Sequence, residues 1–236
     1  MRYEYANLPS YEDFAAGRAL HHAPGLTNFP ARLAIELMGR CLAQANLRAP
    51  AVVYDPLCGA GALITVAAIA HAGRIGRVRG TDADARAVQV AQKNVALLAP
   101  GGLEARARTL EEMGARFGRA SYAGAAASAR RLAQMLPDGG IPAEAFRANA
   151  FSLPQDDFFA DVILTDLPYG DMTDWAAGGA EQFLPALRGA LAPSGVVCVV
   201  ADKGQTCAGE GFVRVARGNV GKRRFEMFRL CDETSI

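Results

Sequence analysis

The chain has 236 residues, of which 51% are hydrophobic and 21% charged, as expected for a soluble globular protein. The formal net charge of +1 excludes a global field that attracts nucleic acid, so any such affinity must come from local patches. The five cysteines are scattered without a CxxC pair, which predicts neither a zinc site nor a disulfide framework. The most apolar run, residues 60–72, is too short to span a bilayer, and residues 1–5 lack the apolar stretch of a signal peptide. We therefore expect a cytoplasmic protein without a metal or a membrane partner.

The N-terminal part of the chain predicts an extension that precedes an α/β pattern. Residues 1–49 form this extension, in which Pro30 can open a helix after a loop rich in Pro and Gly. The apolar run 51–55 then predicts a buried strand, and a glycine turn leads from it into a helix over about residues 62–72. Strand, turn and helix in this order are the start of a doubly wound sheet.

The pattern continues and is interrupted once. A second strand over 78–82 precedes a helix that Asp84 can cap. An Ala- and Arg-rich stretch, residues 103–143, predicts two short helices with breaks at Gly114, Gly118 and Pro137. Further strands are expected over 145–149, 161–165 and 196–200, a helix over 181–191, and an antiparallel pair within 212–231. We predict a single α/β domain over residues 1–236. Its doubly wound, mostly parallel sheet has seven strands and an antiparallel C-terminal strand, with an N-terminal helical extension and a helical insertion.

The turn after the first strand reads Asp55-Pro56-Leu57-Cys58-Gly59-Ala60-Gly61. Glycine lets a ligand approach the backbone closely because it has no Cβ. Nicotinamide enzymes place three glycines here to cradle a pyrophosphate, whereas this turn has two. S-adenosylmethionine has no pyrophosphate, and its ammonium could pair with an acidic residue such as Asp55. An ordinary tight turn is the alternative for the two glycines alone.

Two later strand ends would complete a cofactor site. Asp82 ends the second strand, where a carboxylate can accept both ribose hydroxyls. Asn149 follows the third strand, and its carbonyl oxygen can accept from the adenine amino group or simply form a turn. The predicted S-adenosylmethionine site comprises Asp55, Pro56, Cys58, Gly59, Gly61, Asp82, Ala83, Asn149, Ala150 and Asp166.

A second motif, Thr165-Asp166-Leu167-Pro168-Tyr169-Gly170, resembles the (Asp/Asn)-Pro-Pro-Tyr loop of methyltransferases that act on planar nitrogen. Such a nitrogen is a poor nucleophile because its lone pair is delocalised, so the loop must hold it in line with the methyl group. Asp166 would accept from the N–H group and could take its proton, while Tyr169 stacks on the base. Pro168 stiffens the loop, but Leu167 replaces the first proline and leaves its carbonyl less constrained. A plain turn is the alternative.

Substrate contacts are expected from aromatic and basic side chains. Trp175, the one tryptophan, could stack on a neighbouring nucleotide or pack its own loop. Arginines gather in the insertion and near the C-terminal hairpin, where they could bind phosphate or form a solvated face: Arg106, Arg108, Arg116, Arg119, Arg130, Arg131, Arg223 and Arg224. The predicted catalytic residues are Asp166, Leu167, Pro168 and Tyr169, and the predicted RNA contacts are Tyr169, Trp175, Phe29, Arg116 and Arg119.

The whole chain resembles rRNA guanine methyltransferases of the avilamycin-resistance type, which are found in actinobacteria. Besides the two loops, the resemblance rests on residues 21–25, 29–34, 93–98 and 112–131, and it includes the leucine in place of proline. It implies a monomeric, Rossmann-like enzyme that uses S-adenosyl-L-methionine and releases S-adenosyl-L-homocysteine. It further implies methylation of a guanine nitrogen in 23S rRNA, naked or in the large ribosomal subunit, and resistance to an orthosomycin. It makes residues 103–143 a family feature rather than a separate domain.

Three alternatives remain open. An N-methyltransferase of another nucleic acid or of protein would share the tyrosine loop, although a DNA enzyme would usually carry a larger target-recognition domain. A catalytically silent RNA module that binds S-adenosylmethionine would be expected to have lost Asp166 or Tyr169, and both are present. A nicotinamide-dependent reductase is disfavoured by the missing third glycine.

Overall fold

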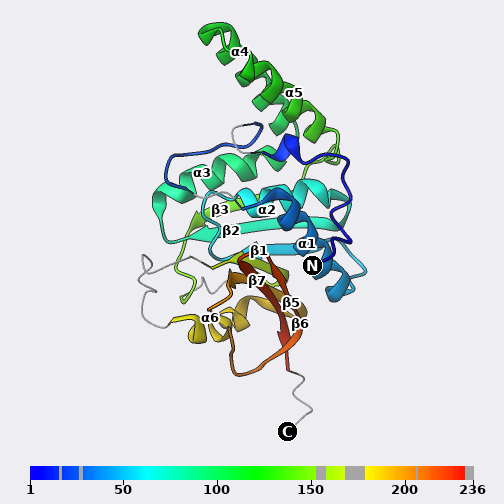
Figure 1. The fold of residues 1–236 in the computed structure, drawn as a ribbon, viewed down its shortest axis with the longest axis vertical. Coiled ribbons are helices and arrows are strands. Elements are labelled where there is room, and N and C mark those ends of the chain that lie inside the picture. Colours follow the sequence, from blue (N-terminus) through cyan, green and yellow to red (C-terminus); the bar gives the residue numbers. More distant parts are fainter. Residues whose placement is uncertain (16–17, 27–28, 153–157, 168–178, 206, 232–236) are drawn as a thin grey trace.

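The computed structural model describes residues 1–236 except 16–17, 27–28, 153–157, 168–178, 206 and 232–236 (Figure 1). The strands within the described residues are β1 Ala51–Asp55, β2 Ile75–Asp82, β3 Ala143–Arg147, β4 Ala160–Asp166, β5 Leu191–Asp202, β6 Phe212–Val220 and β7 Arg223–Leu230. They form one seven-stranded sheet in the order β3-β2-β1-β4-β5-β7-β6.

The sheet is parallel from β3 to β5, and β7 and β6 add an antiparallel pair. From β1 the chain winds outward in one direction through β2 and β3, and from β4 it winds in the other through β5. The direction therefore reverses between β1 and β4, and ligands of open α/β sheets bind at the carboxyl ends of the strands at such a point. This is the sheet that the sequence predicts.

Helices cover both faces of the sheet. Their bounds are α1 Ala31–Ala45, α2 Ala62–Ala70, α3 Ala85–Val95, α4 Gly102–Phe117, α5 Ser121–Ala133 and α6 Gly179–Leu187. Short 3-10 turns lie at η1 Glu12–Phe14, η2 Ala72–Arg74, η3 Ala96–Leu98 and η4 Arg188–Ala190. Successive side chains of β4 point to opposite faces: Val162 and Leu164 pack in the core under α1 and α2, whereas Ile163 packs in the core under α6.

Helices α4 and α5 pair into a hairpin that projects from the α3 side of the molecule (Figure 1). The two helices confirm the prediction for residues 103–143, but the break expected at Gly114 is wrong because Gly114 lies inside α4. A Cβ on Gly114 would stand 3.2 Å from the Cβ of Tyr122, so this glycine permits close helix packing. Gly118 does end α4, with φ +65° in the left-handed region.

Several element boundaries differ from the sequence prediction. Strand β3 begins at Ala143 instead of residue 145, and β2 begins at Ile75 instead of residue 78. Helix α6 ends at Leu187, and β5 begins at Leu191, the residue at which the predicted helix 181–191 ends. The register of β5 against β4 shifts between the pairs Ala160–Leu191 and Val162–Val196. This irregularity accommodates a proline within a strand, as bulges do.

The N-terminal extension is fastened to the helices rather than free. The buried carboxylate of Glu36 on α1 accepts from the backbone N–H groups of Glu4, Tyr5 and Ala6 at 2.7–3.0 Å. Asp13 accepts from Ser128 and from Arg131 Nε of α5, both at 2.8 Å. As expected, Pro30 lies at the start of α1.

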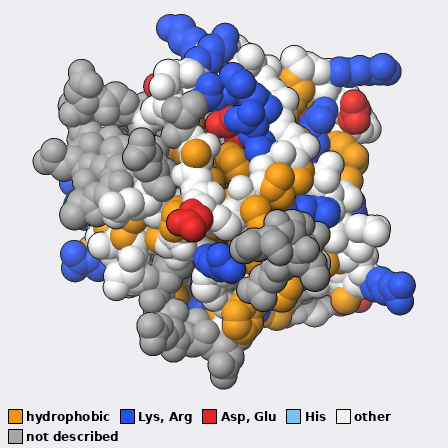
Figure 2. Space-filling model, turned by 90° about the horizontal axis from the view of Figure 1, so that it is seen from below, with side chains coloured by type: hydrophobic (Ala, Val, Ile, Leu, Met, Phe, Trp, Pro, Cys, Tyr) orange, Lys and Arg blue, Asp and Glu red, His pale blue; other side chains and the backbone are white. Residues whose placement is uncertain are grey.

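The opposite end of the molecule carries β6, β7 and α6 (Figure 1). Seen from this end, hydrophobic side chains lie across the middle of the face, and basic side chains lie both along its border and between the hydrophobic ones (Figure 2). Within the part of the chain that the structure describes, no helix is long and apolar enough to cross a membrane.

Candidate active site

Three neighbouring strands each end in a carboxylate at the point where the winding direction reverses. Asp55 ends β1, Asp82 ends β2 and Asp166 ends β4. Because the carboxyl ends of parallel strands share one edge, the fold gathers these residues although 111 positions separate the first from the last in the chain. The structure therefore brings together the three acidic residues that the sequence predicts for the site.

Asp55 is fully buried and ionises with difficulty. Its Oδ1 atom accepts from the Leu57 N–H group at 3.1 Å and from the Thr165 hydroxyl at 2.8 Å. Burial raises the pKa of Asp55 to about 7; these hydrogen bonds oppose the rise, and the negative charges of Asp82 and Asp166 add to it. A cation beside this group would restore the carboxylate, so the arrangement suits an ammonium ligand.

The two predicted glycines have different tasks. Gly59 has φ +52°, and a Cβ placed on it would meet no heavy atom within 4 Å, so its side of the turn is open to a ligand. Gly61 has φ +73°, and a Cβ there would stand 3.1 Å from Cα of Ala91 on α3. Gly61 thus allows α2 to begin against α3, whereas Gly59 leaves space at the site.

Asp82 holds the turn in place. Its Oδ2 atom accepts from the Gly59 N–H group at 2.8 Å, and its Oδ1 atom accepts from Asp84 N–H at 2.9 Å. Each oxygen keeps a second lone pair, which could accept from a ribose hydroxyl. The Asp84 carboxylate accepts from the Arg86 N–H group at 2.8 Å, which confirms it as the cap of α3.

The other residues predicted for this part of the cofactor site are Pro56, Cys58 and Ala83, whose contacts lie within the protein. Pro56 is buried, and its carbonyl accepts from the Thr81 hydroxyl at 3.4 Å. Cys58 is buried, and its Sγ packs against Gly80, where an added Cβ would stand 3.1 Å from it. Cys58 is thus a small side chain of the core. Ala83 is exposed, and its carbonyl accepts from Arg147 Nε at 2.9 Å.

Asn149 forms a turn, the alternative that its sequence position left open. Its Oδ1 atom accepts from the Phe151 N–H group at 3.0 Å, and its carbonyl accepts from Ser152 N–H at 2.9 Å. The side chain is exposed, and Ala150 beside it is buried. The Phe151 ring packs edge-on against Phe183 of α6, with ring centres 6.2 Å apart.

The predicted catalytic loop is anchored at Leu167, where the (Asp/Asn)-Pro-Pro-Tyr pattern has its first proline. The Leu167 N–H group donates to the Val200 carbonyl at 2.8 Å, a bond that proline could not make, and the Leu167 side chain is fully buried. The N–H group and the side chain of Leu167 are thus held in place, and the lower constraint expected for its carbonyl stays a prediction. Pro168, Tyr169 and Trp175 lie outside the described residues.

A basic residue that sequence reasoning placed at the surface lies beside Asp166, the predicted catalytic carboxylate. Arg223 Nη2 is 3.9 Å from Asp166 Oδ2, and its guanidinium carbon is 4.9 Å from the ring centre of Phe29. The predicted contact residue Phe29 is thus linked to Asp166 through Arg223. Its neighbour Arg224 is buried beside Glu226 at 3.5 Å, which contradicts a phosphate contact for Arg224.

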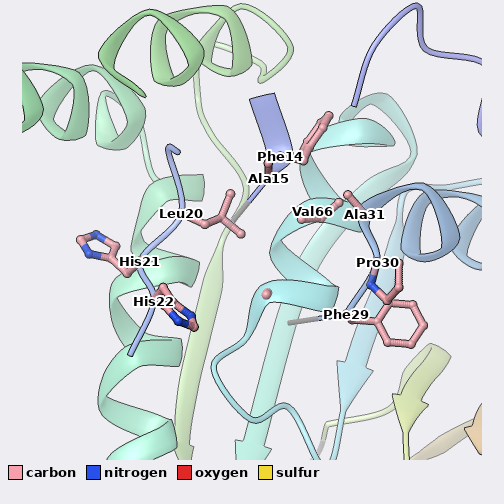
Figure 3. Close-up of a pocket in the computed structure, with 10 residues that line it drawn as sticks. Phe14, Ala15, Leu20, His21, His22, Phe29, Pro30, Ala31 and Val66 are labelled. Carbon is pink, nitrogen blue, oxygen red and sulfur yellow. The ribbon is translucent and has the colours of Figure 1, made fainter. Parts of the chain in front are cut away.

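A cavity of about 240 Å³ lies between the N-terminal extension and α2. Phe29 and Pro30 form one of its walls, Leu20 and His22 another, and Val66 of α2 also lines it (Figure 3). Because α2 begins directly after the glycine turn, the cavity adjoins the predicted cofactor site. Its aromatic and apolar walls come from a segment that composition alone marks only as a loop.

Asn94 ties this segment to the glycine turn, and sequence reasoning missed it. The fully buried side chain accepts from His21 N–H at 2.7 Å and donates to the carbonyls of His21 at 3.1 Å and Ala60 at 2.8 Å. Burial and the nearby charges of Arg106 and Lys93 lower the pKa of His21 to about 4, so its ring is neutral at neutral pH. In the sequence, Asn94 is one polar residue in a helix, and nothing local gives it a role.

The insertion arginines separate into engaged and available side chains. Arg130 pairs with Glu111, Arg131 with Asp13, and Arg106 donates to the Ala19 carbonyl. Arg116 and Arg119 are exposed at the turn between α4 and α5, where phosphate contact stays a prediction.

Comparison of the sequence and the structure with known proteins identifies the family of this chain. The chain is 36% identical over 230 residues to the 23S rRNA (guanine(2535)-N(1))-methyltransferase of Streptomyces viridochromogenes, covering 93% of this chain and 92% of that protein. The solved structure of rRNA methyltransferase AviRa from the same organism matches with a TM-score of 0.85 and 35% identity, over 97% of this chain and 96% of that chain. TrmN from Thermus thermophilus matches with a TM-score of 0.53 and 18% identity, over 93% of this chain and 52% of that chain, which shows the fold alone. The family described as rRNA methyltransferase AviRa matches residues 1–223, and the chain therefore belongs to the AviRa family of rRNA methyltransferases.

Proposed function

We propose that this enzyme transfers a methyl group from S-adenosyl-L-methionine to N1 of a guanine in 23S rRNA. The observation that carries the proposal is the set of three carboxylates, Asp55, Asp82 and Asp166, around a glycine turn whose outer side is open. The Streptomyces relative, named for guanine-N1 methylation of 23S rRNA, supports the acceptor. The solved AviRa structure supports the same fold over nearly the whole chain.

The chemistry of the site fits S-adenosyl-L-methionine. Asp55 would pair with the ammonium, which offsets the penalty of a buried carboxylate. Asp82 keeps free lone pairs for the ribose, and Gly59 leaves room for the ligand beside the turn. The turn at Asn149 and Ala150 would border the adenine. When bound, the cofactor supplies an electrophilic methyl group on its sulfonium, and S-adenosyl-L-homocysteine is the product.

Asp166 would act on the guanine. The N1 atom carries a proton and shares its lone pair with the ring, so methylation requires that this proton leave. Asp166 would accept the N1–H hydrogen bond and take the proton as the nitrogen is methylated, a role worth about 10²- to 10⁴-fold in rate. Arg223, 3.9 Å away, stabilises negative charge on Asp166 before the proton arrives. The anchored backbone of Leu167 would aim its carbonyl as a second acceptor.

The other parts of the proposal concern the substrate and setting. Tyr169 and Trp175 would stack on bases of the RNA. Phe29, in the wall of the cavity beside the cofactor site, would contact the RNA as well. Arg116 and Arg119 would bind phosphates. We propose that the chain acts as a monomeric, single-domain enzyme in the cytoplasm, where ribosomes are found. Orthosomycin resistance stays a prediction; it is checked by the inhibitory concentration of avilamycin for a sensitive host that expresses the enzyme.

The test uses tritiated S-adenosyl-L-methionine with separate pools of deproteinised 23S rRNA, large ribosomal subunits, tRNA, genomic DNA and cell protein. Label in 23S rRNA, free or in the subunit, is expected. Label only in DNA, tRNA or protein would keep the methyl transfer and refute the substrate. Cofactor binding without label in any pool would refute the proposed activity and favour a silent binding module.

A further inference from the structure

The turn of the α4–α5 hairpin presents an aromatic ring between two cations. This turn, Arg116-Phe117-Gly118-Arg119, is called the hairpin tip below. Phe117 is 53% exposed, one of the most exposed large hydrophobic residues in the described part of the chain. Arg116 and Arg119 are the two charged residues between Met113 and Ala129, so the tip is purely basic. It lies at the end of the hairpin that projects from the body (Figure 1).

The ring of Phe117 is supported by its neighbours. The Arg116 guanidinium carbon is 5.3 Å from its ring centre, and the Tyr122 ring centre is 6.5 Å away at an interplanar angle of 32°. Gly114 lets the Tyr122 stem pack closely against α4, and Gly118 makes the left-handed turn that begins the return of the chain. Local packing thus positions the tip, while about half of the Phe117 surface stays in solvent.

The chemistry of this arrangement matches RNA. A phenylalanine ring stacks on any unpaired base, and arginines bind the phosphates beside it. A protein partner that used hydrophobic burial would need a larger apolar patch than one ring. The tip carries no acidic side chain that would repel a phosphate chain.

We propose that the hairpin tip is a second rRNA contact, apart from the catalytic carboxylates, in which Phe117 stacks on an unpaired base and Arg116 and Arg119 bind adjacent phosphates. This rests on the function proposed above. The 16 residues of α4 give a helix about 24 Å long, which carries the tip away from the body of the molecule (Figure 1), and we infer that it meets nucleotides outside the target loop. The enzyme would therefore bind a folded RNA larger than that loop more tightly than a short hairpin around the target alone.

The experiment compares methylation kinetics of the full-length wild type, Phe117→Ala, Phe117→Trp and Arg116→Ala/Arg119→Ala, on the 23S rRNA or subunit that the wild type methylates and on a short hairpin around the mapped target. A matched control is Arg48→Ala/Phe159→Ala, which removes one exposed arginine and a phenylalanine of 54% exposure. Both precede the amino ends of adjacent strands β1 and β4, at the edge of the sheet opposite the three carboxylates. All variants should bind S-adenosyl-L-methionine as the wild type does.

Phe117→Ala should raise KM for the large substrate about 5- to 100-fold with kcat unchanged, as the loss of one stacked base does, and Phe117→Trp should restore it. The double arginine variant should lower the slope of log affinity against log salt by about 1.5. The short hairpin and the control variant should show neither effect. A photo-crosslinking phenylalanine analogue at position 117 should attach to rRNA.

Three results would overturn the proposal. Unchanged KM in both tip variants on a substrate that the wild type methylates would refute the contact, whereas an inactive wild type would refute the proposed function itself. Equal losses on the short hairpin, without rescue by Phe117→Trp, would indicate a structural role. Crosslinking to a ribosomal protein instead of rRNA would assign the tip to a protein partner.

Discussion

The Thr165 hydroxyl donates a 2.8 Å hydrogen bond to the Asp55 carboxylate, and both residues are buried. Thr165 directly precedes Asp166, so this bond joins the strand that leads into the glycine turn to the strand that ends in the proposed catalytic carboxylate. The two halves of the site thus share one buried polar contact. A change in the charge of Asp55 will therefore alter the electrostatic environment of both the glycine turn and Asp166.

Cofactor affinity should depend on pH through Asp55. Its pKa in the free enzyme is about 7, so the group is mainly protonated below that pH, and only the carboxylate pairs with an ammonium. The association constant for S-adenosyl-L-methionine should therefore rise up to about tenfold per pH unit between pH 5.5 and 7. Titration calorimetry across this window measures it. Asp55→Asn should bind weakly with a flat profile, and a flat profile in the wild type would contradict the assignment.

The same pKa shift affects stability with a definite sign. The folded pKa of Asp55, about 7, lies above the ordinary value of 3.8, so its stabilising contribution is fully present below about pH 4 and is lost as pH rises through about 7. Asp55→Asn removes the titrating group. Denaturant unfolding should therefore show that the free energy of unfolding falls less between pH 5 and pH 8 in Asp55→Asn than in the wild type. An equal loss in both would assign the pH dependence to other groups.

Alanine at the two glycines of the turn should separate binding from folding. Gly59→Ala should fold, with about 1–2 kcal/mol of backbone strain, but weaken cofactor binding because the new Cβ occupies the open side. Gly61→Ala adds contact with Ala91 to the same strain and should lower the free energy of unfolding by about 2–5 kcal/mol. Denaturant unfolding and cofactor titration measure the two effects. If Gly61→Ala weakened cofactor binding and Gly59→Ala did not, the ligand would lie on the other side of the turn.

Asn94→Ala should loosen the N-terminal extension from the glycine turn. The change leaves the backbone groups of His21 and Ala60 without their partners and should lower the free energy of unfolding by about 1–3 kcal/mol. It should also raise KM for S-adenosyl-L-methionine more than it changes kcat. Gln92→Ala is the control, since Gln92 lies on the same helix and donates to Ala145 instead. Equal effects of both variants on KM would show that Asn94 has no specific role at the site.

Introducing the first proline of the (Asp/Asn)-Pro-Pro-Tyr pattern by Leu167→Pro should destabilise this enzyme. The substitution removes the hydrogen bond to Val200 and a fully buried side chain, and we expect a loss of about 2–5 kcal/mol. Leu167→Met, which keeps both the N–H group and the volume, should lose less than about 1.5 kcal/mol. Thermal unfolding compares them. A proline variant as stable as the wild type would mean that the loop is not anchored through Leu167.

The sequence predicts the features that depend on local pattern. Buried strands show as apolar runs, and the meeting of Asp55, Asp82 and Asp166 follows because each ends a strand of one parallel sheet. The early start of β3 was not predictable locally, since Glu144 is held there by Arg77 and Arg79 of β2.

The contacts that complete the site depend on tertiary structure. Asn94 meets His21 from 73 positions away, and Arg223 reaches both Phe29 and Asp166. Neither spacing has a periodicity that sequence reasoning can detect. For the same reason, the sequence does not distinguish an arginine that pairs with an acidic residue of the same chain, such as the exposed Arg131, from an arginine that is available to a ligand.

The most direct measurement is nucleoside mass spectrometry of 23S rRNA after reaction with S-adenosyl-L-methionine and the wild type or Asp166→Ala. We predict N1-methylguanosine at a single nucleotide with the wild type. Asp166→Ala should form it about 10²- to 10⁴-fold more slowly while binding the cofactor equally well. A methyl group on another base or on ribose oxygen, or full activity in Asp166→Ala, would contradict the proposed chemistry.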